Sequence, residues 1–565
     1  MKIKELYDSN ETITVESYLA KNGVLDIKDF FNPTGIHLDN YFDYKSMSEA
    51  VDIFNYHRLL NDGAYILCDS GDTDGITSTV ILYDYMTKLN EDWDIKILIH
   101  EGKQRGLKDE ELFNKILNNP KGLLIIPDSG TNDKEQLNEL YEKTNLDCIV
   151  LDHHSYETPI EKGCLVNNKD ENSNVSRNGS GCLVTHKFLQ ALDVQYDKKW
   201  SGQYIDMVSL SLISDSMPMF DEQNRTYYYY GLQYSNLIHN KFLKAMFDNF
   251  IGDKPYTQKD ISFKIIPKIN SICRSKNQEL KQKLILSFLG LNDIDEMLSL
   301  CAENHELQTK TVDNIIKENE DNIEKLKNNN LIIFTDDNMP QSYSGLVSAK
   351  IMNKCNGKPT ICGKIKDGIL IGSLRSPIPL RKELNDNKYV NWAQGHENSC
   401  GISIDENNIQ NLIDYYNSLN VDYEPYITVL KSYSIKSIPK RLYGLFEPYN
   451  EFWGKDLPKP IFHITNIKFN PKDVAIIGKD KRTIKITSDD IELVIFNCLR
   501  KDKENLLLGY YENDVFVSEP KNKNMVLECI GILGVNKWNG KEKLQIIIED
   551  YEVKELQKRT INSVF

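Results

Sequence analysis

Three aspartates fall within six residues of the segment "CDSGDTDGITST", which follows an apolar run. They are Asp69, Asp72 and Asp74. Carboxylates this close repel one another unless a positive group or water lies between them. Similar groups follow later apolar runs, namely Asp128 in "PDSG", the triplet "DHH" at 152–154 and Asp215 in "SLISDSM". Side chains of these types in this pattern are candidates for binding divalent cations.

Carboxylate oxygens combined with an imidazole nitrogen suit Mn²⁺ or Mg²⁺, and the absence of cysteine from the set disfavours a structural zinc. More than four candidate ligands suggest two cations, which can clamp the attacking and leaving oxygens of a phosphoryl displacement. The ordinary alternative is that each aspartate caps a helix or begins a turn, as Asp69 is expected to do. His153 and His154 could also be buried core histidines.

The elements that would position these side chains form an α/β pattern. Short apolar runs predict buried parallel strands at 64–68, 95–99, 122–127 and 147–151. The intervening segments are long enough for crossover helices, so a doubly wound parallel sheet is expected. In such sheets ligands bind beyond the carboxyl ends of the strands. Because the acids and imidazoles follow three of the four strands, they should converge on one edge.

The remaining chain predicts further lobes. Residues 201–217 are expected to form an amphipathic helix that ends near Asp215, where the helix dipole disfavours a carboxylate that has no cation partner. Helices are expected over 226–300, followed by a long charged helix over 302–330. A second α/β unit is expected next, with strands at 331–337, 359–365, 368–377 and 395–404 and a helix at 344–357. The end of the chain, 445–565, is expected to be rich in strands. A five-stranded barrel of the oligonucleotide-binding (OB) kind fits that end.

Composition excludes several classes of protein. The chain has 565 residues and a formal net charge of −15, which argues against binding nucleic acid through bulk electrostatics. Its eleven cysteines form no C-x-x-C pair and predict reduced thiols in a cytoplasmic protein. No apolar run reaches the roughly 18 residues of a membrane span, so no membrane association is expected.

Four segments of this chain resemble, in order, the four motifs of the DHH phosphoesterases: "DTDGITST", "PDSG", "LDHH" and "SLISDSMP". The resemblance extends to the RecJ-type single-strand-specific 5′→3′ exonucleases through "PKINSICR" at 267–274, "GSLRSP", "QGHENSCGISI" and "GVNKWNGKEKLQIIIEDYE". It covers most of the chain from about 51 to 552. Where the family has Gly-Gly-His, this chain has Gln394-Gly395-His396.

The resemblance implies roles for individual residues. Two divalent cations, Mn²⁺ or Mg²⁺, would be bound by Asp72, Asp74, Asp128, His153 and Asp215. His154 would face the scissile phosphate, and Asp152 would orient the histidine pair. Arg274 would hold a 5′-terminal phosphate. The nucleic-acid backbone would be held by Ser373, Arg375, Gly395 and His396.

The expected protein is thus a metal-dependent exonuclease that degrades single-stranded DNA from the 5′ end to mononucleotides in repair, recombination or replication. Its expected domains are an N-terminal extension (1–50), a DHH catalytic domain (51–225), a helical region with a connecting helix (226–330), a DHH-associated substrate-binding domain (331–440) and an OB-like nucleic-acid-binding domain (445–565). A monomer is expected. Whether its acidic surface docks a single-strand-binding protein or a helicase stays open.

Three rival functions are weaker on the same sequence. A hydrolase of short RNA or cyclic dinucleotides would not need the strand-rich C-terminal segment. A non-catalytic replication scaffold would usually have lost ligands, whereas the full set is present here. For a small-substrate pyrophosphatase, the helical region and the last domain would be surplus.

Overall fold

The computed structural model describes residues 2–556 apart from 101–105, 157, 253–255, 420–425, 455, 456, 479, 514 and 539, and it leaves the side chains of 235, 451 and 538 undescribed. The chain divides into two compact units. The larger unit is Lys28–Pro425, and the smaller unit combines Met1–Ile27 with Tyr426–Phe565.

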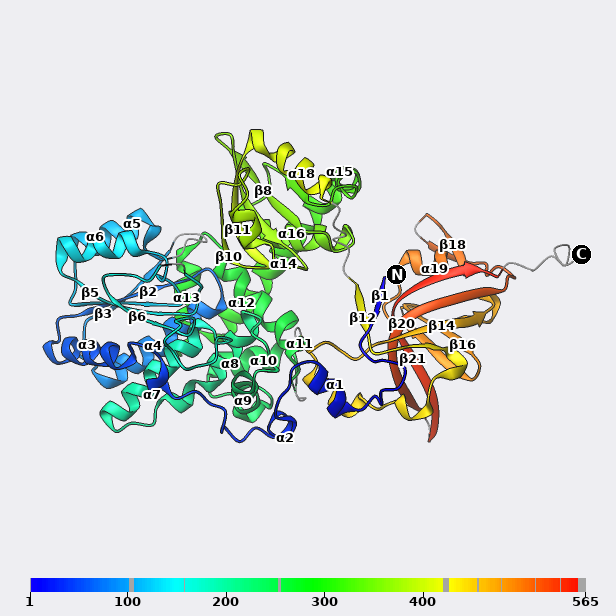
Figure 1. Ribbon diagram of the computed structural model, residues 1–565, viewed down its shortest axis with the longest axis horizontal. Coiled ribbons are helices and arrows are strands. Elements are labelled where there is room, and N and C mark those ends of the chain that lie inside the picture. The colour runs from blue at the N-terminus through cyan, green and yellow to red at the C-terminus, as the bar shows by residue number, and fades with distance from the viewer. Residues whose placement is uncertain are drawn as a thin grey trace, which may run out of the picture. The chain divides into compact units, whose positions relative to one another are not determined.

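A parallel sheet with the order β3-β2-β4-β5-β6 forms the centre of the first lobe of the larger unit (Figure 1). Its strands are β2 (Ala64–Cys68), β3 (Ile95–Ile99), β4 (Leu123–Pro127), β5 (Asp147–Asp152) and β6 (Cys164–Asn167). The predicted doubly wound sheet is therefore confirmed. The sequence analysis did not assign β6, because its four residues form too short an apolar run to stand out.

Helices cover both faces of this sheet, which explains why its strands are almost continuously apolar. Alternate residues point to opposite faces, so Ile66 and Ile125 belong to one core cluster and Leu67 and Ile126 to the other. The first cluster includes α3 (Met47–Leu60), α4 (Thr73–Leu89), α7 (Gly181–Tyr196) and α8 (Ile205–Ser214). The second includes α5 (Glu110–Asn118) and α6 (Lys134–Thr144).

A helical region follows, with α9 (Glu222–Gly231), α10 (Lys241–Phe250), α12 (Ile266–Cys273) and α13 (Gln278–Phe288). The predicted helix over 302–330 differs from the structure. Instead, α14 (Ile294–Glu318) begins earlier, and the chain breaks at Asn319 before α15 (Glu320–Leu326). One end of α14 packs into the first lobe through Met297, and the other packs into the second lobe through Val312. The helix thus joins the two lobes.

The second lobe is built on a mixed sheet with the order β10-β11-β9-β8-β7. Its elements are β7 (Ile332–Thr335), α16 (Ser344–Lys354), β8 (Thr360–Lys366), β9 (Ile369–Arg375), α17 (Arg381–Asn385), β10 (Trp392–His396), β11 (Ser399–Asp405) and α18 (Ile409–Ser418). Only β7 and β8 are parallel. Strand β10 lies at the edge of the sheet, as a hairpin with β11.

The smaller unit is rich in strands, as expected for an OB-like region. Its main sheet has the order β13-β14-β20-β21-β17-β16-β15, which is seven strands where five were predicted. These strands are β13 (Ser432–Ser434), β14 (Phe462–Phe469), β15 (Ala475–Ile477), β16 (Thr483–Ser488), β17 (Ile491–Ile495), β20 (Met525–Trp538) and β21 (Lys541–Glu555). The short N-terminal strand β1 (Ile3–Glu5) pairs in parallel with β12 (Ile427–Val429).

All eleven cysteines are buried and unpaired, in agreement with the absence of paired spacing in the sequence. Within the described part of the chain, every helix is too short or too polar to cross a membrane.

Candidate metal centre

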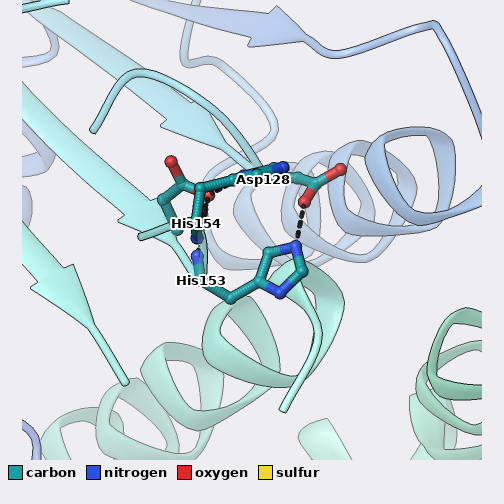
Figure 2. A group of neighbouring side chains, drawn as sticks. Asp128, His153 and His154 are labelled. Carbon is teal, nitrogen blue, oxygen red and sulfur yellow. Dashed lines mark hydrogen bonds and ion pairs between the residues drawn. The ribbon is translucent and has the colours of Figure 1, made fainter. Parts of the chain in front are cut away.

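The predicted acids and imidazoles meet at the carboxyl edge of the parallel sheet. Asp128 follows β4, His153 follows β5, Asp74 lies in the first turn of α4, and Asp215 is the C-cap residue of α8. His153 Nε2 lies 3.2 Å from Asp128 Oδ1, 3.3 Å from Asp215 Oδ2 and 3.7 Å from Asp74 Oδ2. Figure 2 shows the His153 ring directed at the Asp128 carboxylate. One imidazole nitrogen is thus faced by three carboxylates.

The hydrogen bond of His153 Nδ1 determines which tautomer of the ring these carboxylates face. His153 Nδ1 lies 3.1 Å from the carbonyl oxygen of Gly179, so it carries the proton and donates it. Nε2 then presents a lone pair to the carboxylates. Among the described residues, neither Nε2 nor Asp128 Oδ1 has a hydrogen-bond partner, although both atoms are buried. A lone pair facing carboxylates is unfavourable unless a cation lies between them, so this donor set fits a divalent metal ion.

Burial and neighbouring charges shift the pKa values of these groups. Burial, reinforced by Asp74 and other nearby carboxylates, raises the pKa of Asp128 well above its ordinary value. Burial likewise raises the pKa of Asp74 to about 6. Burial and the neighbouring His154 lower the pKa of His153, which keeps the ring neutral as a metal ligand requires. A bound cation would relieve the repulsion between the carboxylates.

Asp74 is held in place by the start of α7. Its two carboxylate oxygens accept hydrogen bonds from the backbone N–H groups of Gly181 and Cys182, both at 2.8 Å. The hydroxyl of Ser211 donates a third hydrogen bond at 2.6 Å. A helix N-terminus favours negative charge, so this contact keeps a buried carboxylate ionisable and oriented. The sequence analysis missed this support, although the N-cap residue Ser180 before an apolar run was a signal for it.

Asp128 occupies a constrained backbone position. Its φ of 62° lies in the left-handed region, and its N–H donates to the carbonyl oxygen of Leu151 at 2.8 Å. A Cβ on Gly181 would come within 2.3 Å of Asp128 Oδ1. The lack of a side chain at Gly181 therefore leaves room for the Asp128 carboxylate.

Asp72 and Asp74, which share the first motif, have different surroundings in the structure. Asp74, His153 and Asp215 form one group of potential ligand atoms within 4.8 Å of one another, and Asp128, Asp152, His153 and His154 form another. Asp72 belongs to neither group. It is the N-cap residue of α4 and accepts a hydrogen bond from the N–H of Gly75 at 3.4 Å. Its charge still contributes to the raised pKa values of Asp74 and Asp128.

Asp152 differs from the other acids because its carboxylate has hydrogen-bond donors within the protein. Its Oδ1 accepts hydrogen bonds from the N–H groups of His153 and His154 and lies 2.7 Å from His154 Nδ1. Burial alone would raise its pKa, but the facing His154 ring and these donors hold the pKa well below its ordinary value. This geometry suits an orienting carboxylate rather than a metal ligand.

The second lobe places His396 against the same site. The His396 ring stacks on His154 with centroids 5.8 Å apart and an interplanar angle of 24°, and it lies 6.1 Å from His153. Gly395, at the end of the β10–β11 hairpin, has a φ of 129°, which L side chains rarely adopt. A Cβ there would also come within 3.1 Å of Cys400 Cα. The hairpin therefore reaches the histidine pair through a backbone that glycine favours.

The residues predicted to bind phosphate belong to both lobes of the larger unit. Arg274 is the C-cap residue of α12, and Arg375 ends β9 against Gly345, where a Cβ would come within 2.5 Å of the guanidinium. Burial lowers the pKa of Arg375 to about 10, and the charge of Arg274 adds to this effect. The Ser373 hydroxyl lies 2.8 Å from that of Ser344. Two half-buried guanidinium groups that repel each other are an arrangement that an anion would stabilise.

Lys281 of α13 lies in the protein interior, beside the first acidic segment. Lys281 is fully buried, and its Nζ lies 3.0 Å from Ser70 Oγ and 3.3 Å from the carbonyl oxygen of His100. It therefore places a positive charge beside the acidic loop that contains Asp69 and Asp72. Nothing in the local sequence indicated this, because the contact joins segments 211 residues apart.

Comparison with known proteins gives two family matches and several relatives. Residues 64–212 match the DHH family, N-terminal domain, and residues 439–550 match the RecJ OB domain. An SPbeta prophage protein of Bacillus subtilis strain 168, YorK, which has the provisional name single-strand DNA-specific exonuclease, is 27% identical over 95% of this chain and 95% of its own length. The single-stranded-DNA-specific exonuclease RecJ of the same strain is 22% identical over 94% of this chain and 65% of its own length.

The fold has a counterpart among solved structures. RecJ from Thermus thermophilus in complex with Mn²⁺ superimposes with a TM-score of 0.70 at 19% identity. The match covers 94% of this chain and 74% of that one. The fold of this chain therefore resembles that of RecJ over nearly its whole length.

Proposed function

We propose that this chain, which is similar to the DHH family and to RecJ in sequence and fold, is a metal-dependent exonuclease acting on single-stranded DNA. It would remove mononucleotides from the 5′ end, in DNA repair, recombination or replication, as a cytoplasmic monomer. One observation carries the proposal: a neutral, buried His153 whose free nitrogen faces three carboxylates within 3.7 Å, at the carboxyl edge of the sheet. The domain boundaries predicted from the sequence stay part of the proposal.

Divalent cations, two Mn²⁺ or Mg²⁺ ions, would be held by Asp74, Asp128, His153 and Asp215, with Asp72 adding negative charge from the start of α4. When bound, such ions supply Lewis acidity and an activated water for attack on phosphorus. The protein provides the fixed ligand geometry. The N-terminus of α7 orients Asp74, and the Gly179 carbonyl sets the tautomer of His153.

His154 and His396 would contact the phosphate that is cleaved. Asp152 is ionised and holds the Nδ1 proton of His154, so the ring can carry positive charge beside a phosphoryl oxygen. His396 stacks on His154 from the second lobe. Cleavage would therefore need both lobes, because each contributes an imidazole.

The 5′ polarity would come from Arg274 and Arg375. Hydrolysis adds water across the P–O3′ bond, so it releases one nucleotide and leaves a new 5′ phosphate on the shortened strand. Two guanidinium groups suit a terminal phosphate, which carries more charge than an internal diester. The charge of Asp72 acts on the Arg274 guanidinium and favours its charged form, which supports a phosphate site near the acidic edge.

The test is a time course on single strands labelled at the 5′ or the 3′ end and on blunt duplex, with Mn²⁺, Mg²⁺ or EDTA. We expect metal-dependent release of 5′ mononucleotides from single strands only. Loss of nucleotides from the 3′ end would contradict the polarity. If pure, folded protein cleaves no polymer, the scaffold or a small nucleotide substrate becomes the better assignment.

A further inference from the structure

We infer that Trp392 forms a base-stacking site on the second lobe, contacting single-stranded DNA outside the metal centre. This inference rests on the proposed function. It assigns to Trp392 a contact with the substrate that lies outside the site of cleavage. Its basis is the face of the second-lobe sheet to which His396 belongs. The same strand, β10, carries both residues.

Successive side chains of a strand point to opposite faces, so Trp392, Gln394 and His396 share one face of β10. All three are exposed, whereas Ala393 between them is 1% exposed and packs into the core. His396 is the residue that stacks on His154. The exposed face of an edge strand therefore leads directly away from the metal centre, with Trp392 at its far end.

The register extends this face across the sheet. Trp392 pairs with Ser403 of β11, and Ser403 pairs with Ile371 of β9. Ile371 is 43% exposed, Ile369 beside it on the same face is 37% exposed, and Trp392 is 37% exposed. Ile369 and Ile371 are neighbours on β9, and Trp392 lies two strands away across the buried Ser403. Several large apolar side chains exposed on one face of a sheet, rather than singly, indicate a binding surface.

The charges beside this strip are mixed, with more positive than negative groups. Ile371 pairs with Lys364 and Ile369 with Lys366, both on β8, while Asp405 of β11 pairs with Ile369 on its other side. At the other end, Arg375 and Ser373 lie on the same face of β9. Apolar and aromatic side chains flanked by cations form the usual platform for single strands, because bases stack while phosphates meet the charge.

Trp392 is also held in a defined position. A Cβ on Gly401 of β11 would lie 3.4 Å from Cζ3 and 3.7 Å from Cη2 of the indole. The ring therefore leans over a residue that has no side chain, toward the His396 end of the strand. A ring supported in this way by the backbone loses little entropy when a base stacks on it.

The occupant is a nucleobase of the strand whose phosphate lies at the metal centre. Stacking does not require hydrogen-bond readout, so this site would tolerate any sequence. Only a strand long enough to extend along β10 could reach it. The inference therefore predicts an effect that depends on substrate length.

The experiment compares Trp392→Ala, Trp392→Phe and the wild type, with Tyr415→Ala as a matched control. Tyr415 is also an exposed aromatic of this lobe, at 39%, but it lies on α18, which packs against the opposite face. Each variant is assayed as the full chain with a long 5′-phosphorylated oligothymidylate and with the 5′-phosphorylated dinucleotide. Binding of the long strand is measured separately by the fluorescence anisotropy of a 3′-labelled strand in an Asp128→Ala background, where it is not cut.

For Trp392→Ala we expect roughly 10-fold weaker binding and a roughly 10-fold higher KM for the long strand, as for the loss of one stacked base. The kinetics of the dinucleotide and kcat should stay unchanged, and Trp392→Phe should restore most of the affinity. Tyr415→Ala should behave like the wild type.

Two results would overturn the inference in different ways. If the wild type cleaves or binds single strands and Trp392→Ala does so equally well, the stacking site is wrong and the proposed function stands. If the wild type neither binds nor cleaves single strands, both fail together. An equal KM increase for the dinucleotide would place Trp392 in the structure of the cleavage site rather than in a separate stacking site.

Discussion

Two clusters of histidine and aspartate lie at opposite edges of the same parallel sheet. At the carboxyl edge, His153 faces three carboxylates but makes no hydrogen bond to them. At the amino edge, His57 of α3 lies between Asp62 and Asp147, with Nδ1 and Nε2 each 2.9 Å from a carboxylate oxygen. Each ring nitrogen of His57 thus has a carboxylate of its own. The clusters contain the same residue types, yet only one leaves its nitrogen unsatisfied.

The hydrogen-bond partners of the two imidazoles distinguish a metal site from a cluster of ion pairs. At the amino edge the protein supplies every partner of the imidazole, and the two carboxylates are partly open to water. At the carboxyl edge a backbone carbonyl accepts a hydrogen bond from the ring, and Asp74 and Asp128 are buried beside it. Residue composition cannot separate these cases, whereas the hydrogen-bond partners of each nitrogen can.

Replacing Asp128 should have the largest effect. We expect Asp128→Ala to lower the rate of single-strand cleavage by at least about 100-fold, because loss of a ligand should exceed the loss measured for outer-shell partners. The measurement is the initial rate with saturating Mn²⁺. Asp147→Asn, at the amino edge, is the matched control and should keep its rate. Equal losses in the two variants would remove the functional distinction between the edges.

A single added methyl group should have the next largest effect. Gly181→Ala would bring a Cβ within 2.3 Å of Asp128 Oδ1, so the carboxylate must move. We expect a rate loss of about 10- to 100-fold, since misplacement on this scale is costly at a reacting centre. Gly202→Ala is the control, because a Cβ there would meet nothing within 4 Å. An active Gly181→Ala variant with normal Mn²⁺ affinity would speak against the assigned position of Asp128.

Metal binding should stabilise the protein in a pH-dependent way. Without metal, the pKa of Asp74 is raised to about 6 from 3.8, so the folded chain binds a proton more tightly than the unfolded chain between these values. The contribution of this group to stability therefore falls as pH rises through that window, and a cation must displace the proton. At 100 times its dissociation constant, Mn²⁺ should add about 2.7 kcal/mol.

Thermal unfolding with and without Mn²⁺ at pH 8 and pH 5 measures this effect. We expect a clear rise of the unfolding midpoint at pH 8 and a much smaller rise at pH 5. The rise should persist in His57→Gln and vanish in Asp128→Ala. A metal shift that is the same at both pH values would contradict proton competition at the carboxyl edge.

The smallest effect is expected at the amino edge, on stability alone. His57→Gln leaves at least one of the two carboxylates without its partner, and we expect a cost of about 1 to 3 kcal/mol. The measurement is the thermal midpoint, with Lys143→Ala as control, because its exposed pair with Glu139 should contribute less than about 1 kcal/mol. A gain or loss of Mn²⁺ affinity in His57→Gln would show that the two edges are not independent.

Much of the site was predictable because it follows a topological rule. The strands at 64–68, 122–127 and 147–151 were evident from apolar runs, and the rule for parallel sheets places whatever follows them on one edge. Asp74, Asp128 and His153 therefore came together as expected. That Asp72 caps α4 was not predictable, because the direction of its carboxylate depends on an orientation that spacing alone does not contain.

Local periodicity and chain order are enough to predict the parallel sheet, the succession of lobes and the types of side chain at the carboxyl edge. Which atoms remain unsatisfied depends on the folded structure. The α7 N-terminus lies 107 residues from Asp74, and the His396 ring meets His154 from another lobe. Such contacts arise from packing between distant segments, and packing assigns the partners that distinguish His153 from His57.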